Sequence, residues 1–418
     1  MAITTQSRNF EMSNPRDVAE DIEASEESPE AAASDYPVAS DEDVDNQLGS
    51  QPFRVVYQTN NFLLPQIRDL IVDGDDVNLR PEYQRRLRWS TTQKSLLIES
   101  LLLNVPVPPV FFYENDLARY EVMDGQQRLN AIKEFLSNGL VLRGLQIIPA
   151  LNGRSYAQLP PKVKRGLDRS SISAIVLLQE SKSRIQKSGS ARFYELRRFV
   201  FERLNTGGKR LSAQEIRNAI YAGHFNSLIV ELSRDPTFTR IWDIPPYTKS
   251  DPSEYYEEPE RQKNTLYKTM GDCQLVLRFF ALNEDSHIQG SMKAILDRCM
   301  ERNADCTPAM KEAMRTQFLS RLKLADELFD GQPFSMSATG ASHAYRPVAG
   351  IYDGVMVAID ELWEMRETLL TRKNDIQVAY SSLVTARREG GELTGAANTS
   401  ADIRKRIAIF RELFARFI

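Results

Sequence analysis

The feature that most constrains the fold of this chain is a short polar turn within Val122–Leu129, between a strand-like and a helix-like segment. Upstream, Arg119–Met123 is short, aromatic and β-branched, which is typical of a strand. Downstream, apolar residues recur at helical spacing from Leu129 to Leu136. The turn itself is therefore expected to carry a strand into a helix, and it reads Asp124-Gly125-Gln126-Gln127-Arg128.

This turn has two interpretations. Backbone N–H groups at a helix start lack internal partners, so such a place suits a phosphate or another anion. Asp124 would then hold a metal ion or act as a base, and Arg128 would stabilise phosphate charge. Gln126 and Gln127 would orient water or read a base edge. In the alternative, the turn is an ordinary capped corner, with Asp124 as the N-cap and Arg128 on a solvated face.

Composition bounds the class of protein. The chain has 418 residues, of which 42% are hydrophobic and 26% charged, as in an ordinary globular protein. No apolar run approaches the roughly 20 residues of a membrane span. Three cysteines and three histidines form no recognisable zinc site, and this cysteine usage suits a reducing cytosol. Together with the absence of a signal peptide, these features predict a cytoplasmic protein that does not contact a membrane. A Walker-type phosphate loop is absent from the sequence.

The charge of the chain is unevenly distributed. Residues 1–50 contain 13 acidic and 2 basic residues and carry −11, which leaves +7 on the rest. Such a tail is expected to be disordered. It would serve solubility, or act as a tether or a nucleic-acid mimic that competes for a basic groove.

The pattern of elements predicts two folded domains after this tail. Residues 51–185 are expected to be mixed α/β, with strands at 53–58, 110–114, 119–123 and 172–179 and helices at 64–72 and 90–103. Residues 186–418 are expected to be helical. Helices are predicted at 193–204, from the capping box of Ser212 and Glu215, and at 264–283, 290–302, 307–329, 351–370, 373–388 and 399–416. The fold class is therefore α+β.

Two further polar clusters accompany the turn. The Arg-rich stretch 80–89 includes Tyr83 and Trp89, so it could pair with phosphates while its aromatic rings stack on bases. It could equally be a basic surface loop. The second cluster, 201–210, joins a charged helix end to the turn Gly207-Gly208, and in the simpler interpretation is a helix–turn–helix corner with a buried salt bridge.

These clusters, in this order, resemble the ParB/sulfiredoxin-like N-terminal domain of GmrSD-type modification-dependent restriction enzymes. The most specific part of the resemblance is the motif Asp124-Gly125-Gln126-Gln127-Arg128-Leu129. It extends over roughly 53–370. The other matching stretches are Tyr83-Gln84-Arg85 with Trp89, Leu97–Ser100 through Pro106-Val107-Pro108, Phe201–Gly208, Leu211-Ser212 with Glu215–Asn218, Leu275–Phe279, and the helix near Ser291–Met300.

The resemblance implies a ParB-like domain that binds and hydrolyses a nucleotide to control restriction in phage defence. We expect this hydrolysis to use Mg²⁺, with Asp124 as the metal ligand. The implied catalytic residues are Asp124, Gln126, Gln127 and Arg128. The implied nucleotide-binding residues are Tyr83, Gln84, Arg85, Gly125, Arg203, Asn205, Thr206, Gly207 and Gly208. Arg86, Arg88, Lys209 and Arg210 are expected to bind DNA. Family members that cut DNA carry a second, His-containing nuclease domain, which is not apparent in this sequence, so cleavage by this chain itself is not expected.

Three functions remain open from the sequence. The first is a regulatory or sensor protein that hydrolyses a nucleoside triphosphate slowly. The second is a ParB-like DNA-binding module without turnover, and the third is an adaptor that recruits a separately encoded nuclease. The candidate partners are accordingly a nucleoside triphosphate, DNA, such a nuclease and a second copy of the chain.

Overall fold

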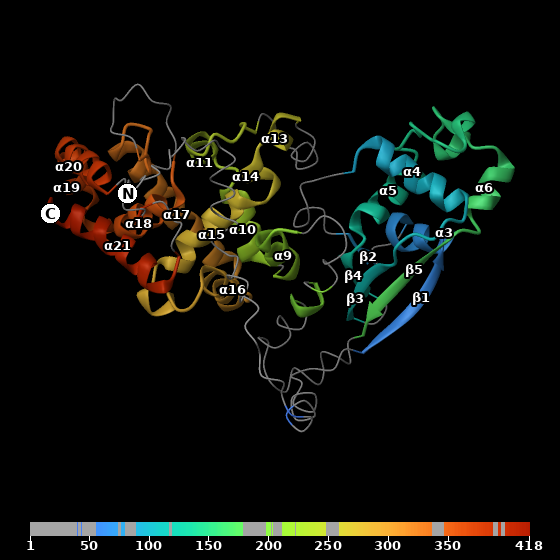
Figure 1. The fold of residues 1–418 in the computed structure, drawn as a ribbon, viewed down its shortest axis with the longest axis horizontal. Helices are drawn as coiled ribbons and strands as arrows, with labels where there is room; N and C mark the ends of the chain where they lie inside the picture. Colours follow the sequence, from blue (N-terminus) through green and yellow to red (C-terminus); the bar gives the residue numbers. More distant parts are fainter. Residues whose placement is uncertain are drawn as a thin grey trace, which may run out of the picture. The chain divides into compact units, whose positions relative to one another are not determined.

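The computed structural model describes part of the chain. The described residues are 40, 43, 56–73, 77–79, 89–116, 119–178, 198–201, 203, 211–221, 223–247, 259–336, 347–387, 392–393 and 398–418. The chain divides into two compact units, of which the first ends at residue 210 and the second begins at Leu211 (Figure 1). The expected tail, residues 1–50, lies almost entirely outside the described residues. None of the helices in the described part is long and apolar enough to cross a membrane.

The N-terminal unit is built on one mixed sheet. Within the described residues, five strands pair in the order β1-β5-β3-β4-β2. β1 with β5 and β3 with β4 are antiparallel, whereas β5 with β3 and β4 with β2 are parallel. The strands are β1 (Tyr57–Leu63), β2 (Val77–Asn78), β3 (Val110–Asp116), β4 (Arg119–Asp124) and β5 (Ser171–Leu177).

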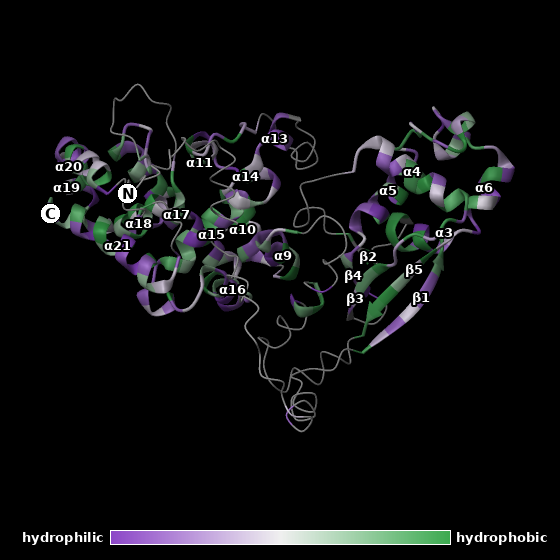
Figure 2. Ribbon diagram, viewed as in Figure 1, coloured by the Kyte–Doolittle hydropathy of each residue, from purple (hydrophilic) through white to green (hydrophobic). Residues whose placement is uncertain are grey.

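Helices lie against this sheet and enclose one core (Figure 1). They are α3 (Leu64–Arg68), continued by a π-helical turn at Asp69–Asp73, then α4 (Thr91–Leu102), α5 (Gln126–Leu136) and α6 (Pro161–Leu167). The buried residues of β3 and β5 that join this core alternate along each strand, as in Ile172, Ala174 and Val176. β5 is largely hydrophobic and the edge strand β1 is not (Figure 2). The predicted mixed α/β N-terminal region is confirmed.

A buried carboxylate holds the loop that follows α5. Glu99 on α4 is 4% exposed and accepts hydrogen bonds from the backbone N–H groups of Gln146, Ile147 and Ile148 at 3.1, 2.8 and 2.8 Å. Burial alone would raise the pKa of this carboxyl group, but the three donors outweigh it and lower the pKa below 4.5. The loop is therefore tied to α4 by a charge-assisted cluster.

The C-terminal unit is helical, as predicted. All twelve residues of α15 (Gly271–Leu282) are buried, and α18 (Ala349–Glu361) is buried along most of its length. Gly354 on α18 faces α21, where a Cβ atom would lie 3.1 Å from the Arg406 carbonyl oxygen and closer still to the Phe410 ring. The helices are α9 (Ala213–Ile220), α10 (His224–Leu232), α11 (Pro236–Ile241), α13 (Pro259–Lys263), α14 (Thr265–Lys268), α15 (Gly271–Leu282), α16 (Met292–Arg302), α17 (Pro308–Leu328), α18 (Ala349–Glu361), α19 (Arg366–Thr371), α20 (Lys373–Ala386) and α21 (Ser400–Ala415).

Some predicted boundaries differ from the structure. The strand expected at 53–58 overlaps β1 only at Tyr57 and Gln58. The helix expected at 264–283 is divided into α14 and α15, because Met270 adopts a left-handed conformation at φ +57°. The helix expected at 351–370 is interrupted by a 3₁₀ turn at Trp363–Met365. Of the helix expected at 193–204, residues 198–201 and 203 are described, and they are helical.

Candidate functional site

The central turn joins β4 to α5 through a glycine in the left-handed conformation. Gly125 is the N-cap of α5 with φ +94° and ψ 8°. An added Cβ atom would lie 2.5 Å from Val110 Cγ1 on the neighbouring strand, so both the backbone angle and the space require glycine. The predicted strand–glycine–helix arrangement is confirmed. Because glycine has no side chain, no side-chain acceptor caps the first turn of α5.

Asp124 does not cap the helix, so the expectation of an Asp124 N-cap is wrong. Its Oδ2 instead accepts from Arg128 Nη2 at 2.7 Å, one helical turn later. Arg128 Nη1 donates to the carbonyl oxygen of Pro108 at 2.5 Å. The Arg128 side chain is 11% exposed and that of Asp124 is 48% exposed. Arg128 is therefore fixed at the helix start and does not lie on a solvated face, while Asp124 remains accessible.

The two glutamines of the turn bond to the chain on either side of the Arg-rich stretch. Gln126 is 6% exposed, and its Nε2 donates to the carbonyl oxygen of Leu79 at 2.5 Å. Gln127 Oε1 accepts from the backbone N–H of Trp89 at 3.3 Å. Residues 80–88 connect Leu79 to Trp89, so both ends of that stretch are attached to the first turn of α5. Sequence reasoning assigned these glutamines to water or a base and missed this backbone role, because partners 47 and 38 residues away leave no local signal.

The other predicted site residues are only partly described. Arg203 is exposed, with its guanidinium 5.4 Å from the centre of the Phe199 ring. The structure does not describe Tyr83, Gln84, Arg85, Arg86, Arg88, Asn205, Thr206, Gly207, Gly208, Lys209 or Arg210. Their roles stay predictions.

The helix after the second cluster has a structural role in the described part. Ser212 caps α9 in the predicted capping box, with the Glu215 N–H donating to its hydroxyl oxygen at 3.1 Å. Arg217 Nε donates to Asp297 Oδ1 at 2.7 Å, and both residues are buried. This ion pair joins α9 to α16, whereas residues 202 and 204–210 of the corner lie outside the described residues, so the salt bridge expected within the corner stays a prediction.

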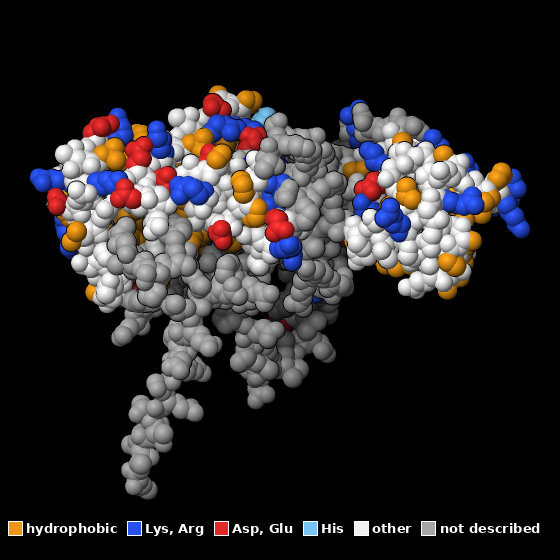
Figure 3. All heavy atoms as spheres, turned by 90° about the horizontal axis from the view of Figure 1, so that it is seen from above, with side chains coloured by type: hydrophobic (Ala, Val, Ile, Leu, Met, Phe, Trp, Pro, Cys, Tyr) orange, Lys and Arg blue, Asp and Glu red, His pale blue; other side chains and the backbone are white. Residues whose placement is uncertain are grey.

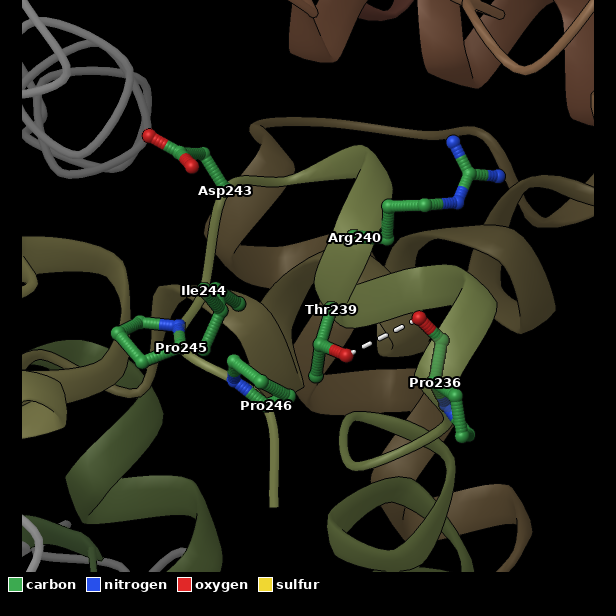
Figure 4. Close-up of a pocket in the computed structure, with 7 residues that line it drawn as sticks. All are labelled: Pro236, Thr239, Arg240, Asp243, Ile244, Pro245 and Pro246. Carbon is green, nitrogen blue, oxygen red and sulfur yellow. Dashed lines mark hydrogen bonds between the residues drawn. The ribbon is translucent and has the colours of Figure 1, made fainter. Parts of the chain in front are cut away.

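The described residues around the turn do not form a metal cluster. Among the described residues, no three Asp, Glu, His or Cys side chains are grouped to hold a metal ion. A cavity of about 420 Å³ lies elsewhere, at the end of α11, between Pro236 and Pro246 (Figure 4). Two of its polar side chains are already bonded, since the Thr239 hydroxyl donates to the Pro236 carbonyl oxygen and Arg240 pairs with Asp326.

Comparison with known proteins places the turn inside a recognised domain. Residues 67–222 match the family model described as the GmrSD restriction endonuclease, N-terminal domain. The resemblance inferred from the motifs is confirmed for these residues, although the matched part ends well before residue 370. No curated protein and no solved structure is significantly similar to the chain.

Proposed function

We propose that this chain is a nucleotide-binding regulatory or sensor component of a restriction-type anti-phage defence system, acting in the cytoplasm and hydrolysing a nucleoside triphosphate slowly. The match of residues 67–222 supports the link to restriction. The observation that best supports a nucleotide site is that no side chain caps the start of α5 and that a fixed arginine lies beside it. Helix N-termini with free N–H groups bind phosphate, and the helix dipole favours negative charge there.

Arg128 and Asp124 would make the contacts to the phosphates and the metal. Arg128 would contact the phosphates with the guanidinium N–H groups that Asp124 and Pro108 do not use. Asp124 is half-exposed, and Arg128 occupies only its Oδ2. Asp124 would therefore hold Mg²⁺ together with the phosphates, since Mg²⁺ is commonly bound by one or two carboxylates plus substrate oxygens. When bound, the metal would neutralise charge on the phosphates.

The reaction would be transfer of the terminal phosphoryl group to water. The bond between the γ-phosphorus and the bridging oxygen breaks, and a bond from water oxygen to phosphorus forms, giving nucleoside diphosphate and phosphate. Arg85 would add positive charge beside Tyr83 and Gln84, and Arg203, Asn205, Thr206 and the Gly207-Gly208 backbone would contribute to nucleotide binding. Gln126 and Gln127 would act by holding the ends of the 80–88 stretch at the site. A separately encoded nuclease would then receive the signal.

Phosphate release from a panel of nucleoside triphosphates tests this proposal. Asp124→Asn keeps an acceptor for Arg128 but removes the carboxylate charge, so we expect turnover to fall at least tenfold with folding intact. The matched control is Lys133→Ala, an exposed residue of the same helix, which should leave turnover unchanged. If the wild-type chain neither binds nor hydrolyses any of the nucleotides, the proposal fails.

A further inference from the structure

A second charged surface lies on the N-terminal unit, away from the motif. Between residues 140 and 170 the chain has six Lys or Arg and one Asp. Five of these cations are exposed, and we call them together the loop–α6 surface: Arg143, Arg154, Lys162, Arg165 and Arg169. In the described part of the chain, none of the five forms an ion pair. Unpaired positive charge is thus concentrated in about thirty residues.

Hydrogen bonds hold these residues in one structured surface. The backbone of Leu142 is bonded to Arg154 and Gly153 at 3.0 and 2.8 Å, so the segments carrying Arg143 and Arg154 lie side by side. Arg154 Nη1 donates to the Gln158 carbonyl oxygen at 3.0 Å. Lys164 links α6 to the same loop by donating to the Ala157 carbonyl oxygen at 2.9 Å. The cations therefore project from a fixed scaffold.

Several cations of the helical unit, in contrast, form ion pairs. On α21, Arg404 pairs with Asp285, Lys405 with Glu392, and Arg411 with Glu361. Similar pairs occur on α17, where Lys311 and Arg315 both contact Glu231. In Figure 3, Lys and Arg side chains outnumber acidic ones on the visible side of the N-terminal unit, whereas both signs are interspersed on the helical unit. The excess charge on the loop–α6 surface is thus local and does not follow from the composition of the whole chain.

We infer that the loop–α6 surface binds the phosphodiester backbone of nucleic acid without reading its sequence. Four of the five cations are arginines, whose planar guanidinium groups match phosphate oxygens bidentately. α6 itself presents no fully exposed large apolar side chain, since Val163 is half-buried and Leu167 is buried. The loop exposes Val141 and Ile147, so the vesicle measurement below distinguishes a nucleic acid from a membrane surface. This surface is separate from the nucleotide site and would act whether or not the turn hydrolyses nucleotide.

Fluorescence anisotropy with a labelled 20-base-pair duplex tests the inference on the full chain. Each phosphate neutralised contributes about −0.9 to the slope of log K against log salt concentration. Five contacts give a slope of about −4.5, or roughly a 500-fold loss of affinity between 50 and 200 mM salt. The triple variant Lys162→Ala/Arg165→Ala/Arg169→Ala should make the slope shallower by about 2.7, and Arg143→Ala/Arg154→Ala by about 1.8.

The matched control removes the same charge from paired positions, in Arg404→Ala/Lys405→Ala/Arg411→Ala. It should leave the slope within about 0.5 of the wild type. Equal effects of the two triple variants would show that only net charge matters and would overturn the inference. So would a wild-type chain that binds no duplex at 50 mM salt, or one that binds phosphatidylserine vesicles but not the duplex.

Discussion

Replacing Gly125 with alanine tests the geometry of the central turn most directly. Two separate costs are expected. A residue with a Cβ atom at φ +94° is strained by about 1–2 kcal/mol. The new Cβ would also meet Val110 Cγ1 at 2.5 Å and Cβ at 2.9 Å, in a core where Val110 is fully buried. Overpacking of this kind costs about 1–3 kcal/mol, so the free energy of unfolding of the N-terminal unit should fall by about 2–5 kcal/mol.

Alanine substitutions at two other glycines distinguish the cost of backbone strain from the cost of overpacking. Gly153 also has a positive φ, +82°, but a Cβ there meets nothing within 4 Å, so Gly153→Ala should cost only about 1–2 kcal/mol. Gly166 in α6 has neither constraint, and Gly166→Ala should stabilise by about 0.5–1 kcal/mol. In the double variant Val110→Ala/Gly125→Ala, the cost should be smaller than the sum of the single costs, because the closest clashing atom is gone.

The assay is urea unfolding followed by hydrogen exchange and mass spectrometry. Peptides from β3 and α5 report the N-terminal unit separately from the helical unit. If Gly125→Ala lowers the free energy of unfolding no more than Gly153→Ala does, the close approach of Val110 to the turn does not contribute to stability. If Gly125→Ala is neutral, the left-handed conformation itself is refuted.

The remaining predictions concern buried charges and thiols. Glu99→Gln should destabilise the N-terminal unit by about 1–3 kcal/mol, because three N–H donors lose their charged acceptor. Since folding lowers the pKa of Glu99, its contribution to the free energy of unfolding should be complete above pH 4.5 and be lost as pH falls through the folded pKa. The wild type should therefore be more stable than Glu99→Gln near neutral pH but not in acid. A stability difference that is independent of pH would contradict this. Asp353→Ala should cost the helical unit about 3–5 kcal/mol in urea unfolding, because it leaves Arg278 charged and buried on α15, and an effect below 1 kcal/mol would contradict the buried pair. Burial raises the pKa of Cys299 to about 12, so iodoacetamide should not label it in the native chain at pH 8, and rapid labelling would show that α16 opens.

Local signals in the sequence predicted where several helices begin. Ser90 and Ser212 start α4 and α9 as expected, because each serine accepts from the backbone three residues on and the glutamine or glutamate there returns the bond. The glycine between β4 and α5 was equally readable, since few residues other than glycine tolerate that turn. These elements depend on neighbours within four residues, so a single sequence suffices.

The parts that were not predicted depend on distant partners. β1 includes Asn60 and Asn61, which have low strand propensity, but pairing with β5 along its full length places them in the sheet. No local sequence pattern near Met270 predicts its left-handed backbone conformation. At the site, an aspartate next to a glycine could cap a helix or pair one turn later, and the geometry shows the pair with Arg128. The hydrogen bond of the buried Gln126 likewise depends on Leu79, a residue far away in the sequence.

The attachment of Leu79 and Trp89 to consecutive residues of α5 also has an entropic consequence. It makes the nine residues between them a closed loop, and closing such a loop costs about 2 kcal/mol, a cost that rises only with the logarithm of its length. Doubling the loop with inserted glycine and serine would therefore cost only about 0.6 kcal/mol more. Changes in the length of the Arg-rich stretch should therefore alter the stability of the fold little. Substitution of either glutamine that holds its ends should alter it more.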